Sequence, residues 1–431
     1  MGMLRFVSKR LVPLVALVVT GLAVACNGGG GPSHTTTPGP SPSGSPAASH
    51  TTTPTAATTQ APLSPTQPVA LEEGAAFTEN GVYLVETATG RLWRLGDHGG
   101  TWSPDGKTLL SWGCCIGRGG LDVIDVPGGP AVRIFDGDIA AAALSSDGDR
   151  IAFSRYIDGP NGLFLVNRDG SGLKQLSVDG AWSLQWSPKG DRIVLSDREY
   201  HVRLLEVASG QTIDLADVGG YAPTWSPDGE TLAFGNDSGL YVYDAETGDR
   251  RHVAVGLSAA PIWSPDGTRI AFPFGPRIPM TYGAYAGDSE VGPQIPHVVE
   301  VEGAEPKPLL PARNLSWSPD GTRIAYLSEG CITGSWDIYT VAADDSSEVR
   351  LTTTPESAKE GPFWSPTGTT LAYSTFAQLM LVDAQSRELR TLVVSGTPES
   401  RGPTIHLHGP IWSPDGRYIE FAAGYDHGIC D

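Results

Sequence analysis

The stretch WSPDGTRIAF, residues 263–272, recurs in eight versions along this chain and decides its fold. Two other versions are nearly identical, WSPDGETLAF at residues 225–234 and WSPDGTRIAY at residues 317–326. The remaining versions start at Trp102, Leu144, Trp186, Trp364 and Trp412. Successive versions start about 38 to 54 residues apart, and self-similarity at such a period indicates a propeller or a solenoid.

Each version of the phrase combines a turn with a strand. Pro presets φ, Asp bonds its own backbone and Gly accepts a positive φ, so Pro-Asp-Gly predicts a tight turn. The apolar triplet that follows predicts a β-strand, and the turn then closes a hairpin. A second hairpin follows most versions, as at 240–243 and 250–255 around the turn 245–248. The unit is therefore four short antiparallel strands, A to D, and radial stacking of such units buries both sheet faces.

The number of half-units predicts how the ring closes. An unpaired strand pair, 82–86 and 91–95, precedes the first phrase, and the last phrase, at Trp412, is followed by no second hairpin. The N-terminal pair therefore fits the gap in the last unit, which predicts an all-β propeller of eight four-stranded blades closed by N- and C-terminal strands. Residues 75–78 resemble an additional strand, so seven blades with one irregular unit is the alternative.

These phrases resemble the repeat of TolB-type, WD-like β-propellers, which also occurs in the propeller domains of prolyl oligopeptidase relatives. The resemblance covers residues 71–431 and implies the propeller fold. It implies much less about function, because propellers host binding, scaffolding and enzymatic roles.

The first 26 residues resemble a bacterial lipoprotein signal peptide. A basic start is followed by an apolar run at residues 11–24, which is too short for a stable membrane-spanning helix. The run ends in LAVAC at residues 22–26, which resembles a lipobox with Cys26 as the lipid-modified first residue of the mature protein. Ala23 stands where Leu is usual, so ordinary cleavage that leaves a free Cys26 is the alternative.

A tether is expected to separate the anchor from the propeller. Residues 27–70 are rich in Gly, Thr, Pro and Ser and have almost no charge, so they cannot build a core and predict a disordered segment. The expected location is the bacterial cell envelope, lipid-anchored on the outer side of the cytoplasmic membrane, periplasmic or extracellular. The net charge of −19 argues against a nucleic-acid partner.

Four further cysteines are candidates for disulfides, which an exported protein can form. Cys114, Cys115, Cys331 and Cys430 all follow a predicted B strand. A bridge from Cys430 to Cys114 or Cys115 would join the last blade to the first and is the favoured pairing. A vicinal Cys114–Cys115 bridge with Cys331–Cys430 is an alternative.

Function is expected on the face that carries the B–C and D–A connections, where the sequence departs from the repeat. The longest departure is residues 273–297 in blade 5, and long loops in compact domains are usually functional or disordered. The ligand-binding candidates on this face are Arg277, Tyr282, Tyr285, Arg118, Tyr156, Asp197, Arg198, Trp336 and Tyr425.

Histidines give the one indication of metal chemistry. All but one of the propeller histidines map to that same face, the exception being His252. His406 and His408 stand two apart in an extended stretch, so their side chains point the same way and make half of a metal site. The resemblance adds that TolB-like propellers include metal-dependent oligogalacturonide lyases, although no catalytic set matches here. The sequence also contains no Gly-x-Ser-x-Gly elbow and no HExxH pattern.

The sequence is compatible with two functions. The favoured one is a membrane-anchored, non-catalytic binding or scaffold protein, without a cofactor, for an envelope protein, peptide or glycan. The alternative is a metal-dependent carbohydrate-active enzyme of the polysaccharide lyase kind, which would need a divalent metal at the histidine-rich face.

Overall fold

In the computed structural model the chain divides into two units, Met1–Thr58 with Cys430–Asp431, and Thr59–Ile429. The first unit lies outside the residues that the structure describes. The described residues all belong to the second unit and are 69–71, 81–113, 119–155, 162–177, 180–197, 201–215, 221–236, 238–255, 260–274, 295–303, 305–309, 312–329, 336–344, 347–353, 360–375, 377–394 and 406–424. Within these ranges, no helix is long and apolar enough to cross a membrane.

Seven antiparallel sheets of four strands form consecutive blades, with strands A to D in sequence order. In blades 1 to 3 the strands are β4 (Gly100–Trp102), β5 (Thr108–Gly113), β6 (Gly120–Asp125) and β7 (Ala131–Asp136); β8 (Ile139–Leu144), β9 (Arg150–Arg155), β10 (Leu163–Asn167) and β11 (Lys174–Ser177); β12 (Ser183–Trp186), β13 (Arg192–Ser196), β14 (Val202–Glu206) and β15 (Thr212–Asp214). In blades 4 and 5 they are β16 (Tyr221–Trp225), β17 (Thr231–Asn236), β18 (Gly239–Asp244) and β19 (Arg250–Val255); β20 (Ile262–Trp263), β21 (Arg269–Phe274), β22 (Ile295–Glu300) and β23 (Lys307–Pro308). In blades 6 and 7 they are β24 (Arg313–Trp317), β25 (Arg323–Glu329), β26 (Trp336–Ala342) and β27 (Glu348–Arg350); β28 (Glu360–Trp364), β29 (Thr370–Ser374), β30 (Gln378–Asp383) and β31 (Leu389–Val394).

Blade 8 is assembled from both ends of the described chain. Its sheet has the order β1–β3–β2–β33–β32, where β32 (His406–Trp412) and β33 (Tyr418–Gly424) are strands A and B. Strands C and D are β2 (Gly81–Glu86) and β3 (Leu92–Gly96), which confirms the predicted eight blades and their closure by the N-terminal strand pair. A fifth strand, β1 (Val69–Leu71), pairs with β3 and was not anticipated. The additional strand expected at residues 75–78 lies outside the described residues.

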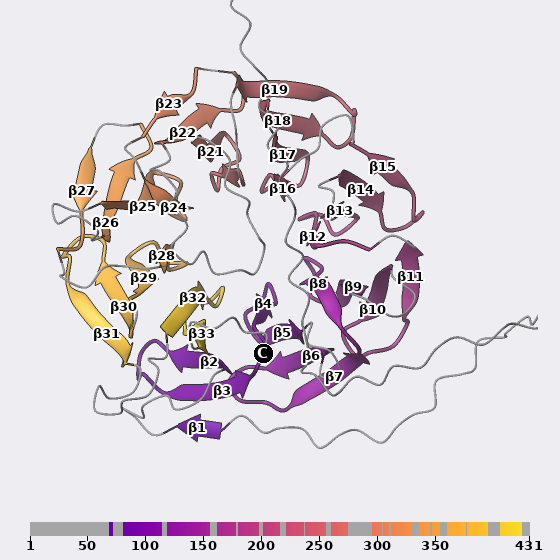
Figure 1. Ribbon diagram of the computed structural model, residues 1–431, viewed down its shortest axis with the longest axis horizontal. Coiled ribbons are helices and arrows are strands. Elements are labelled where there is room, and N and C mark those ends of the chain that lie inside the picture. The colour runs from indigo at the N-terminus through magenta and orange to yellow at the C-terminus, as the bar shows by residue number, and fades with distance from the viewer. Residues whose placement is uncertain are drawn as a thin grey trace, which may run out of the picture. The chain divides into compact units, whose positions relative to one another are not determined.

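The blades are arranged radially (Figure 1). A strands such as β4, β8 and β12 lie nearest the centre of the ring, and D strands such as β7, β11 and β15 form its rim. Apolar side chains fill the space between neighbouring blades. Between blades 4 and 5, for example, Ala233 and Leu240 pack with Trp263, Ile270 and Phe272. The alternating strand pattern therefore places one set of side chains in each of two inter-blade cores.

The A–B turns explain why the phrase is so regular. In blade 5, Asp266 Oδ1 accepts hydrogen bonds from Ser264 Oγ at 2.5 Å and from the Thr268 N–H at 3.0 Å. Ser264 Oγ in turn accepts from the Arg269 N–H at 2.9 Å, and Gly267 adopts φ = 71°. The same Ser–Asp bond recurs in the turns of blades 1, 2, 4, 6 and 8. The Asp of the phrase is therefore structural, as the sequence predicted, and the Ser stabilises the same turn.

The tryptophans of the phrase connect each blade to the one before. In six of the seven phrase tryptophans, the indole Nε1 donates to the carbonyl oxygen of the residue that precedes the Trp position in the previous blade. Six tryptophans make this bond at 3.0–3.4 Å, namely Trp186, Trp225, Trp263, Trp317, Trp364 and Trp412. The phrase residues thus build the joints between blades as well as the turns.

The long departure in blade 5 is shorter than predicted. β21 extends to Phe274 and β22 begins at Ile295, so the segment between the strands is 275–294. The prediction was wrong because the prolines were interpreted as loop residues. Pro273 and Pro296 are register partners in the sheet, so their two missing N–H groups fall at one position of the ladder. His297 lies in β22, with its ring stacked on Phe272 at 5.8 Å between centroids, rather than in a loop.

Candidate functional site

The propeller has two different faces. The turn face consists of the A–B turns, such as 264–268, and the C–D turns, such as 245–248. The loop face consists of the B–C and D–A connections, together with the strand ends next to them. Because the phrase repeats at the A–B turns, this half of the turn face is similar from blade to blade. Differences between blades accumulate on the loop face.

Most predicted site residues lie outside the described residues. These are Arg118, Tyr156, Arg198, Arg277, Tyr282, Tyr285, Tyr425, the lipidation candidate Cys26, and the cysteines Cys114, Cys115, Cys331 and Cys430. His406 and His408 lie on β32 with Gly424 and Ala422 as register partners, and their side chains are outside the described part. Trp336 and Asp197 are described, and both lie on the loop face.

Trp336 is the first residue of β26 and is half-buried. The Arg313 guanidinium lies over its indole, 4.4 Å from the ring centroid, in a cation–π contact. Arg313 begins β24, so the contact joins strands A and C of blade 6 at their loop-face ends. An aromatic ring with a guanidinium on it is a surface that binds planar or anionic groups.

A buried ion pair lies beside Trp336. Asp337 is 1% exposed; its Oδ2 lies 2.6 Å from Arg350 Nη2, and its Oδ1 accepts from Thr352 Oγ1 at 3.0 Å. Arg350 Nε also donates to the Thr352 carbonyl at 2.9 Å. Because both carboxylate oxygens are paired, this network holds the loop-face end of blade 6 in one geometry. The sequence analysis missed it; the only available signal was the hairpin spacing of 13 residues between Asp337 and Arg350.

Blade 3 has a different network at the corresponding place. Asp197 Oδ2 lies 2.8 Å from Arg203 Nη2 and 3.0 Å from His201 Nδ1, and Arg203 Nε lies 3.2 Å from Asp214 Oδ1. His201 is exposed at the mouth of the B–C connection. This arrangement combines an accessible imidazole with a carboxylate that orients it, so it suits hydrogen bonding to a ligand.

A third network lies in blade 1. Arg133 contacts both carboxylate oxygens of Asp122, with Nε–Oδ1 at 2.5 Å and Nη2–Oδ2 at 3.1 Å, and its Nη1 reaches Asp136 at 3.0 Å. The hydrogen bond to Asp122 raises the pKa of Arg133. A Cβ on Gly120 would lie 2.2 Å from the guanidinium carbon, so a larger residue there would force the Arg133 side chain to move. Each of these three blades therefore carries its own polar set on the loop face.

The seam between blades 8 and 1 contains an unexpected carboxyl group. Glu420 occupies the ninth position of the last phrase, where the other seven versions have Leu110, Ala152, Val194, Ala233, Ala271, Ala325 and Ala372. Its Oε1 accepts from the Gly100 N–H at 3.0 Å, whereas its Oε2 is buried without a partner among the described residues. Burial raises the pKa of Glu420 to about 7, and the Gly100 bond opposes that rise. Alignment of the eight phrases would have revealed this residue.

Metal ligation is not supported by the described side chains. Among them, no group of three or more His, Cys, Asp or Glu residues lies close enough to hold a metal ion. The pair His406 and His408 stays a prediction, since their side chains belong to the undescribed part of the chain.

The chain is similar to several propellers. No protein-family model matches it. The Protein TolB homolog of Chlorobium luteolum is 33% identical over 125 residues, which are 25% of this chain. The match spans 27% of that protein's length, so its activity and partners are not transferred.

Solved structures show the fold alone. Porphyromonas gingivalis dipeptidyl peptidase 4 matches with a TM-score of 0.55 and 14% identity, covering 77% of this chain and 58% of that one. The C-terminal WD40 domain of Sif2 matches with a TM-score of 0.53 and 13% identity, covering 81% and 98%. An oligogalacturonate lyase in complex with manganese gives a TM-score of 0.47 at 14% identity, covering 75% and 97%, and carries no argument about chemistry. The protein is an eight-bladed β-propeller whose repeated phrases resemble those of TolB-type, WD-like propellers.

Proposed function

We propose that this protein is a non-catalytic binding or scaffold protein that engages an envelope protein, peptide or glycan through its loop face. One observation carries the proposal: the repeated residues are used for turns and joints between blades, whereas the loop face carries polar sets that differ from blade to blade. A surface whose polar groups differ between blades, as in blades 1, 3 and 6, offers a specific arrangement of donors, acceptors and rings to one partner.

The described loop-face groups suit recognition rather than bond cleavage. Arg313 with Trp336 offers an aromatic and cationic contact, and His201 with Asp197 offers an oriented imidazole. Arg and Trp are also the residue types that most often dominate binding energy at protein interfaces. Asp337 and Arg350 satisfy each other and hold the Trp336 end of β26 in place.

The proposed location is the cell envelope, with the chain held at the outer side of the cytoplasmic membrane by lipid on Cys26. The lipobox-like LAVAC sequence and the uncharged segment between it and β1 support this placement. A lipid anchor and a flexible tether would keep the loop face within reach of envelope partners.

Capture of envelope components by purified variants tests the proposal. The double variant Arg313→Ala/Trp336→Ala, shown to be folded by circular dichroism, should lose most of the captured partner. Lys189→Ala on the turn face, whose Nζ lies 3.2 Å from Glu230 Oε1, is the matched control and should capture as much as the unchanged protein. Equal loss in both variants would argue against a loop-face site.

The alternative, a metal-dependent carbohydrate-active enzyme, has no specific described observation in its favour. It depends on His406 and His408, and elemental analysis of the protein before and after His406→Ala/His408→Ala tests it. Near-stoichiometric metal that is lost in the variant would replace our proposal with this one.

A further inference from the structure

The eight seams between blades are not equal, and the seam between blades 8 and 1 lacks two kinds of joint that occur at other seams. Trp102 is the tryptophan that should donate across this seam, to the carbonyl of Ile411 by analogy with the other six. Its Nε1 is buried and has no hydrogen-bond partner among the described residues. The seam therefore lacks the indole bond that joins six other pairs of blades.

An arginine joint that two other seams have is missing as well. At the seventh position of the phrase, Arg150 and Arg269 each donate to a turn carbonyl of the next blade, Gly190 or Gly321, at 2.9 Å. Both guanidinium groups also cover the next blade's tryptophan ring, at 4.9 and 5.1 Å. In blade 8 this position is Tyr418, which packs edge-on against Trp93 within an apolar cluster instead.

A single buried carboxyl group takes the place of these joints. Glu420 is 4% exposed, and its one hydrogen bond crosses the seam to Gly100 on β4. Its register partners, Ile411 on β32 and Leu84 on β2, are apolar. The carboxyl oxygen also lies beside Gly99, where an added Cβ would be 3.5 Å from it. One N–H donor solvates a neutral carboxyl group adequately but leaves an ionised one undersolvated.

No counter-charge compensates Glu420 within the described part of the chain. Asp97, two residues before Gly99 on the connection into β4, is paired with Arg94 at 2.5 Å. The other titratable groups on the elements packed against it, apart from His406 and His408, are His98, Tyr418, Lys107, Glu86, Tyr83 and Arg417, and none forms a hydrogen bond or ion pair with it. The pKa of Glu420 responds to burial and to the Gly100 bond alone.

We infer that the seam between blades 8 and 1 is the joint at which this ring opens, and that the proton on Glu420 keeps it closed. With Glu420 neutral, the seam is an apolar contact with one hydrogen bond across it. Loss of the proton places a charge between the two blades, and hydration of that charge requires the blades to separate. Opening alters the spacing of blades 8 and 1 on the loop face, so proton concentration controls the geometry of that surface.

The dependence of seam opening on pH has a definite sign and size. Opening returns the pKa of Glu420 from about 7 towards its ordinary 4.5, so the opening equilibrium constant is lowest below pH 4.5. Above pH 4.5 the opening equilibrium constant rises about tenfold per pH unit, and it levels off above pH 7. The total increase is about 300-fold.

Hydrogen exchange of the full chain, followed by mass spectrometry from pH 4.5 to 8, tests the inference. Protection factors, which remove the intrinsic pH dependence of exchange, are compared for the Gly100 region and for the blade 5–6 seam around Trp317. The Gly100 region should lose up to about 300-fold protection as pH rises, and the Trp317 region should not change. Equal behaviour of the two regions would overturn the inference.

Three variants identify the group responsible. Glu420→Gln keeps the shape and the Gly100 bond, and Glu420→Ala introduces the residue found at this position in five other phrases. Both variants should make protection at Gly100 independent of pH. Glu360→Gln is the matched control, because Glu360 Oε2 accepts from the Gly409 N–H across the neighbouring seam. It should leave the pH dependence at Gly100 intact. Persistence of that dependence in both Glu420 variants would contradict our assignment.

Discussion

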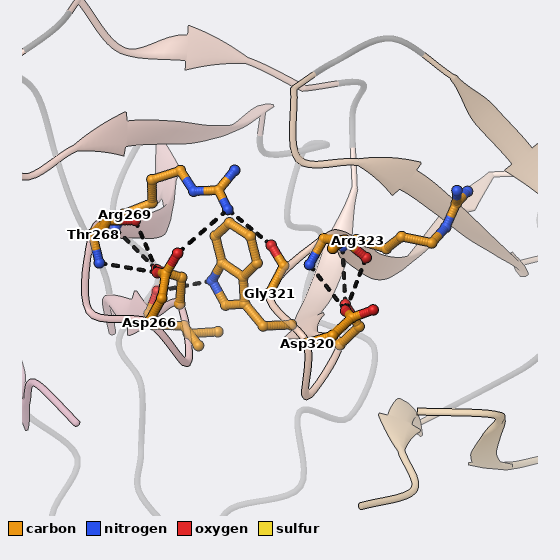
Figure 2. Close-up of polar contacts among 11 residues, drawn as sticks. Asp266, Thr268, Arg269, Asp320, Gly321 and Arg323 are labelled. Atoms are coloured by element: carbon orange, nitrogen blue, oxygen red, sulfur yellow. Dashed lines mark hydrogen bonds and ion pairs between the residues drawn. The ribbon is translucent and has the colours of Figure 1, made fainter. Parts of the chain in front are cut away.

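Arg269 Nη2 in blade 5 lies 2.9 Å from the carbonyl oxygen of Gly321 in the turn of blade 6 (Figure 2). In the opposite direction, Trp317 of blade 6 donates its indole N–H to Ile262 of blade 5 at 3.1 Å. The same guanidinium lies over the Trp317 ring. Blades 5 and 6 thus exchange one hydrogen bond in each direction around a cation–π contact, and the phrase supplies all three groups.

Removal of the arginine should weaken the ring. Arg269→Ala loses a charge-assisted hydrogen bond and a cation–π contact from a side chain that is 22% exposed. We expect a loss of about 1–2 kcal/mol in the free energy of unfolding, measured with urea. Arg251→Ala, on the exposed edge strand β19, is the control and should change that free energy by less than about 0.5 kcal/mol. Equal effects of the two substitutions would contradict a role for Arg269 between blades.

Two Trp-to-Phe substitutions separate the indole hydrogen bond from ring packing. Trp317→Phe leaves the Ile262 carbonyl without its donor, whereas Trp102→Phe removes an N–H that has no partner among the described residues. Both substitutions lose similar ring area. We therefore expect Trp317→Phe to be about 1 kcal/mol more destabilising than Trp102→Phe in urea unfolding. A larger loss from Trp102→Phe would show that its indole N–H is bonded in solution.

Glu420 should make the protein less stable as pH rises. Its folded pKa of about 7 lies above the ordinary 4.5, so its stabilising contribution is complete below pH 4.5 and is lost as pH rises through 7. Relative to Glu420→Gln, the unchanged protein should lose about 3 kcal/mol between pH 4.5 and 8. Parallel stability curves for the two proteins over this range would contradict burial of the carboxyl group.

The turn aspartates should act in the opposite direction. The hydrogen bond from Ser264 lowers the pKa of Asp266 below its ordinary 3.8, so its contribution is present above pH 3.8 and is lost as pH falls. Asp266→Asn should destabilise by less than about 1 kcal/mol at pH 6, because the turn is solvent-exposed. The difference from the unchanged protein should shrink on acidification towards pH 2.5, which urea titrations at both pH values measure.

Much of the fold could be predicted because the phrase uses residues with strong local preferences. Pro, Asp and Gly determine the turn, the apolar triplet determines strand B, and the strand pair ahead of Trp102 predicts closure of blade 8. β1 could not be predicted, since three residues beside a low-complexity segment carry no periodic signal. Pro273 and Pro296 were interpreted as loop residues, although they oppose each other in a sheet.

The site was harder to predict because its groups meet through tertiary contacts. Asp337 pairs with Arg350 only once β26 and β27 have taken their register. From the sequence, Glu420 is only a polar residue within a predicted strand. Its environment depends on Gly100, which closure of the ring places against it. Trp336 was chosen as an aromatic residue on the correct face, but its partner Arg313 comes from another strand of the blade.

Site-specific photo-crosslinking in intact cells tests the central claim most directly. A photoreactive residue at 336 or 201 on the loop face, and at 107 or 189 on the turn face, reports which surface touches a partner. We predict discrete crosslinked species from positions 336 and 201 and none from 107 and 189. The same species from the turn-face positions alone, with none from the loop face, would contradict the proposal that this propeller binds through its loop face.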